Sequence, residues 1–310
     1  MENRILDGKR VGQEIRSELK EKVDAWKKAG RRPPGLAAVL VGDDPASQIY
    51  VSSKVRACDE IGIFSEKITP GADATTKQLV DLVRSLNDRE DIDGILVQLP
   101  LPSHVEEAEV LDEVDPRKDV DGFHPKNVGN LVLGRPCFEP CTPAGIMELL
   151  RRYEIPLSGA RAVVVGRSRI VGKPMAALLT HRNATVTVCH SRTKDLPGVC
   201  SEADLLVAAI GRKAMISDEY IKEGAVVVDV GMNRVTEVEE AERVFGGDER
   251  RMRIVREKGS TLIGDVLPTA MWERASAYTP VPGGVGPLTI AMLMSNTVRA
   301  SEWRTGSPGD

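Results

Sequence analysis

Two side chains that can do chemistry stand four residues apart near residue 50. Tyr50 and Lys54 follow a predicted N-cap, Asp44, with Pro45 at the first helical position, and Gly62 is the expected stop. On such a helix both side chains project from the same face. A lysine can act as a general base or polarise a reacting group. Taken alone, this pattern is more often a surface lysine beside a half-buried tyrosine, so its meaning depends on other segments.

Two further segments place polar side chains where ligands commonly bind. The apolar run Gly94–Gln98 predicts a strand that ends on Gln98, and ligands collect at the carboxyl ends of strands in open α/β sheets. Residues 118–125 read KDVDGFHP and supply a carboxylate, Asp121, on the loop predicted to join two domains. Gln98 and Asp121 are therefore candidate site residues.

A loop rich in glycine and proline opens the last predicted helix. Residues 279–289 read TPVPGGVGPLT and include Pro282, Gly283 and Gly284. Glycine lets the backbone approach a flat ligand closely, because no Cβ stands in the way. These three residues are predicted to bind the substrate.

A second glycine loop, within residues 163–174 (VVVGRSRIVGKP), runs from a predicted strand into a predicted helix. Gly166 would allow the sharp turn, Gly172 would let helix and strand pack closely, and free backbone N–H groups at the helix start suit a pyrophosphate. Ser168 stands where the G-x-G-x-x-G pattern has its second glycine, so a purely structural turn is the alternative. The predicted cofactor-binding residues are Gly166, Arg167, Ser168, Ile170, Val171, Gly172, His190, Ser191 and Arg192.

The end of the next predicted strand decides between NAD and NADP. About 20 residues past such a glycine loop, NAD enzymes usually place an acidic residue on the ribose hydroxyls. Here the chain reads His190-Ser191-Arg192-Thr193, without an acid. Serine and arginine would bind a 2′-phosphate that a carboxylate would repel, and Arg167 adds a second cation. NADP is therefore favoured, although both arginines could instead be ordinary solvated surface charges.

Alternating helix and strand patterns predict an α/β fold with parallel sheets. In the N-terminal part the predicted helices are 8–29, 45–61 and 75–86, and the predicted strands are 36–41, 64–68 and 94–98. After a helix opened by Thr142-Pro143, the predicted elements are strand 162–165, helix 172–180, strands 185–189, 205–210 and 225–230, and helix 286–303. The second set is typical of a doubly wound, Rossmann-like nucleotide-binding domain.

A stretch rich in Gly, Pro and Asp, residues 116–141, interrupts the alternation and marks the predicted domain boundary. We predict an N-terminal α/β catalytic domain, residues 1–140 completed by 285–310, and an NADP-binding domain, residues 141–284, with the active-site cleft between them. Residues 236–258 are highly charged and predict a helical excursion to which no chemistry is assigned.

Composition narrows the class of protein. The 310 residues carry a formal net charge of −4, which gives no general attraction to nucleic acid or anionic membranes. Neither an apolar run long enough to span a membrane nor a signal-peptide core is present, so a cytoplasmic enzyme is expected. The five cysteines are scattered and the four histidines widely spaced, which predicts reduced thiols and no metal site.

Four segments together resemble the methylenetetrahydrofolate dehydrogenase/cyclohydrolase (FolD) family. They are the Tyr-x-x-x-Lys pair at 50–54, VQLPLP at 97–102, KDVDGFHP at 118–125 and PVPGGVGP at 280–287. Residues 166–174 and 228–234 are also similar to family segments, so the resemblance covers nearly the whole chain. Two features depart from the family pattern: the 236–258 region is longer than the usual connection, and Leu288 stands where methionine is common.

The resemblance implies an enzyme of one-carbon metabolism that would also serve purine biosynthesis. Such an enzyme oxidises 5,10-methylenetetrahydrofolate with NADP, hydrolyses the methenyl product to 10-formyltetrahydrofolate, and works as a homodimer. By resemblance, Lys54 is the catalytic lysine, Tyr50 the aromatic residue that stacks on the folate, Gln98 the lysine's neighbour, and Asp121 the pterin-binding carboxylate. The matching cofactor segments contain Arg167, Ser168, His190 and Ser191.

These implied roles agree with the chemistry. Hydride transfer requires mainly that donor and acceptor carbons be held together. Hydrolysis requires water to attack a cationic carbon, for which Lys54 could be the base or the polarising group, while neutral Gln98 orients it without forming an ion pair. Three alternatives stay open: a dehydrogenase-only relative, a non-catalytic folate or dinucleotide sensor, and a different Rossmann-fold dehydrogenase acting on a small acid.

Overall fold

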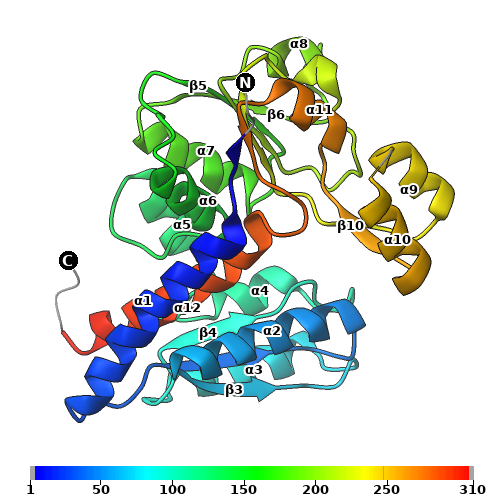
Figure 1. Cartoon of the computed structure of the whole chain (residues 1–310). Helices are drawn as coiled ribbons and strands as arrows, with labels where there is room; N and C mark the ends of the chain where they lie inside the picture. Colours follow the sequence, from blue (N-terminus) through cyan, green and yellow to red (C-terminus); the bar gives the residue numbers. More distant parts are fainter. Residues whose placement is uncertain (1–3, 247, 307–310) are drawn as a thin grey trace. The chain divides into compact units, whose positions relative to one another are not determined.

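The computed structural model describes residues 4–246 and 248–306, and the chain divides into two compact units (Figure 1). The six-stranded unit comprises Met1–Val11 and Thr142–Leu288, and the three-stranded unit comprises Gly12–Cys141 and Thr289–Asp310. Two long helices, α1 (Gly8–Lys28) and α12 (Val285–Arg304), begin in the first unit and continue into the second.

The start of the chain belongs to a different unit from the one predicted from the sequence. Residues 1–11 group with the six-stranded unit rather than with residues 12–140. The physical reason is strand pairing: β1 (Arg4–Ile5) lies parallel to β11 (Ala277–Tyr278), and the Leu6 N–H donates to the Tyr278 carbonyl at 2.8 Å. A two-residue strand has no periodicity from which this pairing could be predicted.

The three-stranded unit contains a parallel sheet of order β3-β2-β4. Its strands are β2 (Gly35–Val39), β3 (Phe64–Ile68) and β4 (Gly94–Val97). Every residue of β2 and β4 is buried, as expected of strands covered on both faces. Helices α2 (Pro45–Ile61) and α3 (Thr76–Asn87) connect the strands, and α4 (Glu107–Asp112) follows β4. Helix α5 (Pro125–Val132) lies within residues 116–141, the predicted domain boundary.

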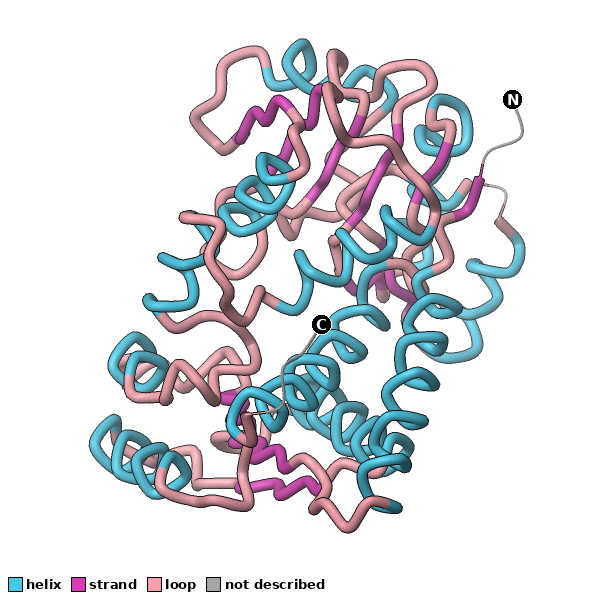
Figure 2. Tube along the Cα trace, turned by 90° about the vertical axis from the view of Figure 1, so that its left-hand side faces the viewer, coloured by secondary structure: helices cyan, strands magenta, loops and turns pink. Residues whose placement is uncertain are grey.

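Alternate residues of β2 enter two different hydrophobic cores. Leu36 and Ala38 pack with side chains of α1, α2 and α12, whereas Ala37 and Val39 pack with side chains of α3 and α4. The sheet therefore has helices on both faces, which Figure 2 shows as cyan segments around the magenta strands.

A buried carboxylate fixes the N-terminal edge of this sheet. Asp93, next to β4, accepts two hydrogen bonds from the Arg32 guanidinium at 2.7 and 2.8 Å and one from Arg304 of α12 at 2.8 Å. It also accepts the N–H of Gly35, the first residue of β2, at 2.9 Å. One side chain thus holds the starts of two strands and the end of a distant helix.

The six-stranded unit is a parallel sheet of order β1-β11-β8-β7-β5-β6. Its remaining strands are β5 (Arg161–Val165), β6 (Thr185–Cys189), β7 (Leu205–Ala208) and β8 (Val226–Asp229). The chain places β6 on one side of β5 and β7 on the other, which confirms the predicted doubly wound fold with its switch point beside β5. Its helices include α6 (Cys141–Arg152), α7 (Gly172–His181), α8 (Leu196–Cys200) and α11 (Pro268–Arg274), with a short 3-10 turn Asp218–Tyr220.

The charged region 236–258 forms a small helical excursion, as predicted. It contains α9 (Val238–Phe245) and α10 (Glu249–Lys258), between the antiparallel strands β9 (Asn233–Val235) and β10 (Thr261–Ile263) (Figure 1). The two helices and the flanking strands share one hydrophobic core, made by Val235, Ala241, Val244, Phe245, Met252, Val255 and Ile263. The charged sequence of this region therefore forms two amphipathic helices, whose apolar residues are buried against each other.

The five cysteines are free and buried. Burial raises the pKa of the Cys58 and Cys200 thiols to about 12, which keeps them protonated. None of the helices within the described ranges is both long enough and apolar enough to cross a membrane.

Candidate active site and dinucleotide site

Helix α2 carries Tyr50 and Lys54 with the boundaries that the sequence predicts. The Asp44 carboxylate accepts the Ser47 N–H at 2.7 Å, Pro45 occupies the first turn, and Gly62 ends the helix in a left-handed conformation with φ 88°. The tyrosine and the lysine therefore share one helix face, with the Tyr50 side chain 41% exposed.

Lys54 is not a surface lysine. It is only 9% exposed, and its ammonium group donates to Gln98 Oε1 at 3.0 Å. The Gln98 amide nitrogen donates in turn to the Leu99 carbonyl at 2.6 Å. Because that carbonyl can only accept, the amide nitrogen must face Leu99 and the amide oxygen must face the lysine. The end of β4 thus holds an acceptor in a fixed orientation toward Lys54.

Asp121 belongs to the same group of side chains. Burial raises the pKa of its carboxyl group, and the nearby positive charge of Lys54 and the Cys141 thiol oppose this rise. The Cys141 thiol also donates to the Val120 carbonyl at 3.2 Å, and Asn296 of α12 donates to the same carbonyl at 2.8 Å. The Asp121 carboxyl group therefore lies within electrostatic range of Lys54, which itself contacts Gln98.

Asp119 and Gly122 fix the loop that carries Asp121. The buried Asp119 carboxylate accepts the N–H groups of Phe123 at 3.1 Å and His124 at 2.8 Å, and the Asn127 amide at 2.8 Å. Gly122 has φ +75°, and a Cβ there would lie 2.7 Å from the backbone of residues 139 and 140. Only glycine fits this turn without displacing the backbone of residues 139 and 140.

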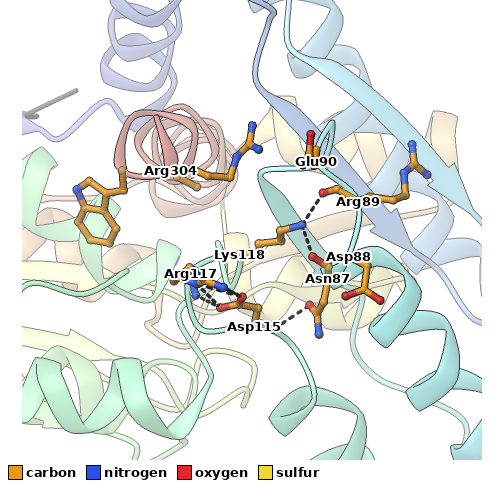
Figure 3. A pocket seen from close by; sticks show the side chains of 10 residues that line it. Asn87, Asp88, Arg89, Glu90, Asp115, Arg117, Lys118 and Arg304 are labelled. Carbon is orange, nitrogen blue, oxygen red and sulfur yellow. Dashed lines mark hydrogen bonds and ion pairs between the residues drawn. The ribbon is translucent and has the colours of Figure 1, made fainter. Parts of the chain in front are cut away.

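Lys118, the first residue of the KDVDGFHP segment, has a structural role. Its ammonium group donates to the carbonyls of Leu86, Asn87 and Arg89 at 3.1, 2.7 and 2.7 Å, at the C-terminal end of α3 (Figure 3). Cations favour that end of a helix because its last carbonyls lack partners within the helix. Lys118 therefore ties the loop of Asp121 to α3.

The pocket around Lys118 does not contain the predicted site residues. Arg117 and Asp115 form an ion pair at its rim, at 2.6 Å, and Arg304 lies on its other side (Figure 3). Its lining residues are Asn87, Asp88, Arg89, Glu90, Asp115, Arg117, Lys118, Ala300, Trp303 and Arg304. Basic and acidic side chains are mixed in this lining, so the pocket presents no cluster of a single charge.

The predicted substrate loop, Pro282 to Gly284, lies in the six-stranded unit. The Lys9 N–H donates to the Gly283 carbonyl at 2.9 Å, and the Gly284 N–H donates to the Pro280 carbonyl at 2.7 Å. A Cβ on Gly284 would lie 2.6 Å from the Pro280 oxygen, so backbone segments approach each other closely here. Gly284 is therefore required by this packing and Gly283 by its φ of +107°, whereas the sequence-based prediction explained both glycines by ligand contact.

The glycine loop after β5 has the predicted shape. Gly166 has φ +126°, and a Cβ there would lie 2.2 Å from the Ala209 carbonyl oxygen at the end of β7. A Cβ on Gly172, the first residue of α7, would lie 2.2 Å from the Gly166 oxygen. The two glycines therefore let backbone pack against backbone in a tight loop, hereafter the cradle, at the switch point of the sheet, where doubly wound folds bind dinucleotides.

Ser168 closes this loop from within. Its hydroxyl oxygen accepts the N–H groups of Val171 at 3.1 Å and Gly172 at 3.2 Å. The prediction of free N–H groups at the helix start is therefore wrong for these two, because a serine in place of the second glycine supplies its own acceptor. Arg167 and Ile170 are exposed on the same loop.

The turn after β6 orders itself through local hydrogen bonds. The His190 N–H donates to Thr193 Oγ1 at 2.9 Å, and the Arg192 N–H donates to His190 Nδ1 at 3.1 Å. Ser191 and Arg192 are exposed there. Residues 190–193 of the described chain include no acidic residue. Where NAD enzymes carry a carboxylate that repels a 2′-phosphate, this turn has the hydroxyl of Ser191 and the cation of Arg192.

Sequence reasoning missed four residues that organise these sites. Two of them, Asp229 and Asp265, are buried carboxylates: Asp229 accepts the N–H of Gly231, and Asp265 accepts that of Arg212 beyond β7. Burial raises the pKa of Asp229 to about 7. The others are Asp119 and Arg251. Arg251 could have been noticed as a charge on the apolar face of α10, four residues before buried Val255.

No group of His, Cys, Asp and Glu side chains in residues 4–246 and 248–306 is arranged to hold a metal ion.

Comparison with protein families gives two matches that together cover most of the chain. Residues 6–121 match the tetrahydrofolate dehydrogenase/cyclohydrolase catalytic domain. Residues 140–305 match the NAD(P)-binding domain of the same family.

Individual relatives are similar over their whole length. The chain is 58% identical to the bifunctional protein FolD of Solibacter usitatus, covering 98% of this chain and 99% of that protein. The crystal structure of a bifunctional FolD enzyme from Campylobacter jejuni superposes with a TM-score of 0.87 at 45% identity, covering 97% of this chain and 99% of that one. A Trypanosoma brucei dehydrogenase-cyclohydrolase, complexed with NADP and an inhibitor, has a TM-score of 0.89 at 36% identity, covering 98% and 99%.

Proposed function

The chain belongs to the tetrahydrofolate dehydrogenase/cyclohydrolase family, and on that premise we propose how its own residues carry out the two reactions. The enzyme oxidises 5,10-methylenetetrahydrofolate with NADP and hydrolyses the methenyl product to 10-formyltetrahydrofolate. Family membership excludes a different Rossmann-fold dehydrogenase. The observation that carries the proposal is the buried Lys54, whose ammonium group donates to the fixed oxygen of Gln98 at 3.0 Å.

Substrate binding is assigned to Asp121, Tyr50 and the loop Pro282–Gly284. A carboxylate accepts hydrogen bonds from the amino and ring N–H groups of a pterin, which fixes the orientation of the ring. Asp121 is held for this purpose by the hydrogen bonds of its neighbour Asp119. The half-exposed Tyr50 ring offers a face on which a flat ligand stacks.

The dehydrogenase step needs a hydride acceptor, which NADP supplies when bound. The chain contributes the cradle at Gly166 and Gly172 for the pyrophosphate, and exposed Ser191, Arg192 and Arg167 for the 2′-phosphate. Ile170, Val171, Ser168 and His190 complete the proposed cofactor-binding set. These residues bind and orient, so the rate depends on how closely they hold the two carbons.

The cyclohydrolase step needs water to attack a cationic carbon and a proton to leave. We assign the movement of that proton to Lys54, with Gln98 as the residue that positions it. Because Gln98 is neutral, the lysine is not held in an ion pair with its immediate partner. Asp121 contributes a carboxyl group nearby whose interaction with Lys54 is electrostatic.

Lys54→Met tests this assignment. Methionine keeps most of the buried volume and removes the ammonium group, so hydrolysis should fall by at least about 100-fold while the Kd for NADP stays within about twofold. Lys67→Met, an exposed lysine of β3, is the matched control. An unchanged rate of hydrolysis in a folded Lys54→Met variant would refute the role of Lys54 in proton transfer.

A dehydrogenase-only enzyme predicts a different time course. Methenyltetrahydrofolate would then accumulate in step with NADPH, whereas the bifunctional enzyme converts it to 10-formyltetrahydrofolate. Following both absorbances in one reaction distinguishes the two, and the same assay detects turnover that a non-catalytic sensor would lack. The ratio of kcat/KM for NADP to that for NAD tests the cofactor assignment, and a preference for NAD would contradict the role given to Ser191 and Arg192.

We further propose that the enzyme is a cytoplasmic homodimer whose product serves purine biosynthesis. The family resemblance supports this, together with β6, which ends the sheet order and exposes Thr185, Thr187 and Val188. An edge strand of this kind offers unpaired backbone to a second copy. Light scattering after gel filtration measures the mass, and a monomer at micromolar concentration would refute the dimer.

A further inference from the structure

One arginine of the charged excursion differs from its neighbours. Along α10, Arg250, Arg253 and Arg256 are exposed, as expected of a solvated helix face. Arg251 is only partly exposed and lies on the side that carries buried Met252 and Val255. Burial also lowers the pKa of its guanidinium group. A side chain that gives up water in this way needs other partners.

Those partners connect the excursion to the loop proposed to bind the substrate. The Arg251 guanidinium donates to Thr261 Oγ1 at 3.1 Å and to the Leu262 carbonyl at 3.4 Å, both on β10. Its other terminal nitrogen donates to the carbonyl of Val281, which directly precedes Pro282. The Phe245 ring lies 5.2 Å away, beneath the guanidinium.

Backbone hydrogen bonds also hold the segment that Val281 begins. The Lys9 N–H donates to the Gly283 carbonyl at 2.9 Å, and the Gly284 N–H closes back on the Pro280 carbonyl at 2.7 Å. Arg251 adds a contact from residues 236–258. A rigid loop requires such anchors, since Gly283 and Gly284 restrict the backbone least of all residues.

We propose that Arg251 is a positioning residue for the substrate loop Pro282–Gly284, so that the excursion 236–258 serves the active site. This inference rests on the proposed function for the loop's role in folate binding. Arginine suits the task because its planar guanidinium presents several N–H donors in fixed directions and can bridge β10 and the loop at once. A lysine ammonium on a flexible stem can satisfy one of these oxygens but does not fix the other.

The kinetic experiment compares Arg251→Met, Arg251→Lys and the exposed control Arg253→Met. Loss of a hydrogen bond to a charged donor predicts a rise of about tenfold or more in KM for methylenetetrahydrofolate in Arg251→Met. Arg251→Lys should recover part of this loss, and Arg253→Met should match the wild type. The KM for NADP should change less than about twofold in all three, because the cofactor-binding cradle at Gly166 is untouched.

A merely structural role predicts another pattern. Arg251→Met would then lower the Tm and the amount of active enzyme while leaving the KM for folate unchanged, and that result would overturn the proposal. If Arg251→Met fails to fold, Thr261→Val removes one of the oxygens that orient the guanidinium and should still raise the folate KM by about two- to threefold. A wild-type KM in that variant would count against the proposal.

Hydrogen exchange tests the same inference without turnover. Amide exchange in a peptide covering residues 281–286 should be faster in Arg251→Lys than in the wild type, and unchanged in Arg253→Met. Unchanged exchange in Arg251→Lys would refute the positioning role whatever the enzyme activity. An inactive wild type with the expected exchange pattern would instead refute the proposed function and leave the anchor established.

Discussion

The contact between Lys54 and Gln98 allows a quantitative prediction. Gln98→Leu keeps the size of the side chain and removes the oxygen that accepts from the ammonium group at 3.0 Å. A hydrogen bond to a charged group contributes about 1.5–3 kcal/mol. If this contact positions the lysine in the transition state of hydrolysis, its loss should lower the cyclohydrolase rate by about 10- to 150-fold. The dehydrogenase rate should change much less, because hydride transfer does not use the lysine's proton.

A second variant at the same position tests how the lysine acts. Gln98→Glu gives Lys54 an acceptor but turns a neutral contact into an ion pair, and it places a second oxygen toward the Leu99 carbonyl, where the amide nitrogen donated at 2.6 Å. If Lys54 must release a proton, hydrolysis should remain at least about tenfold below the wild type. If it acts as a charged polarising group, Gln98→Glu should approach the wild-type rate.

The assay follows the disappearance of added methenyltetrahydrofolate, so hydrolysis is observed without the preceding oxidation. Thermal unfolding of each variant shows whether the fold is retained. Hydrolysis within about threefold of wild type in a folded Gln98→Leu variant would refute the view that Gln98 positions Lys54, since it would imply less than about 0.7 kcal/mol for the contact.

Three further predictions follow from buried groups. Gly166→Ala should weaken NADP binding by at least about tenfold, because the added Cβ would lie 2.2 Å from a backbone oxygen; calorimetric titration with NADP measures this, and a wild-type Kd would contradict the proposed cradle. Asp93→Ala should lower the free energy of unfolding by about 3 kcal/mol. This is the low end for a broken buried ion pair, because Arg32 and Arg304 are about a third exposed and water can solvate them in the variant. A decrease below about 1 kcal/mol, measured by urea unfolding, would show that the network is unimportant. Burial raises the pKa of Asp229 from 3.8 to about 7, so the stability that its bound proton contributes is fully present below about pH 4 and is lost as the pH rises toward about 7. Asp229→Asn should remove this part of the pH dependence, up to about 1.4 kcal/mol per pH unit, and equal slopes of unfolding free energy between about pH 5 and pH 7 in both proteins would argue against it.

Local signals predicted much of the fold. Helix α2 begins and ends where the sequence indicates, because its cap at Asp44 and its stop at Gly62 act within one turn of the helix. The strands β2 and β5 were predictable for a related reason, since runs of buried apolar residues leave few alternatives in a parallel sheet. The pairing of β1 with β11 was not, because it depends on a contact between two-residue strands at opposite ends of the chain.

The sequence indicated which residue types form the candidate site but not that its lysine is buried. A tyrosine and a lysine four residues apart do not reveal that the lysine is buried, which requires the end of β4 and the loop after residue 118 to reach the same place. The serine of the glycine loop shows a second limit. Counting N–H groups at the start of α7 overlooked that Ser168 has an acceptor of its own within reach of two of them.

Lys118 has a consequence for how variants of this enzyme should be interpreted. It stands three residues before Asp121, in a segment that the resemblance marks as part of the site, yet its charge is used to close the end of a helix. A Lys118→Ala enzyme that lost activity would invite a catalytic explanation, although the defect would lie in the anchoring of the loop. An alanine scan through this segment would therefore mix two kinds of failure, one of chemistry and one of architecture. Separating the two requires that the order of this loop be measured in every variant whose rate is measured.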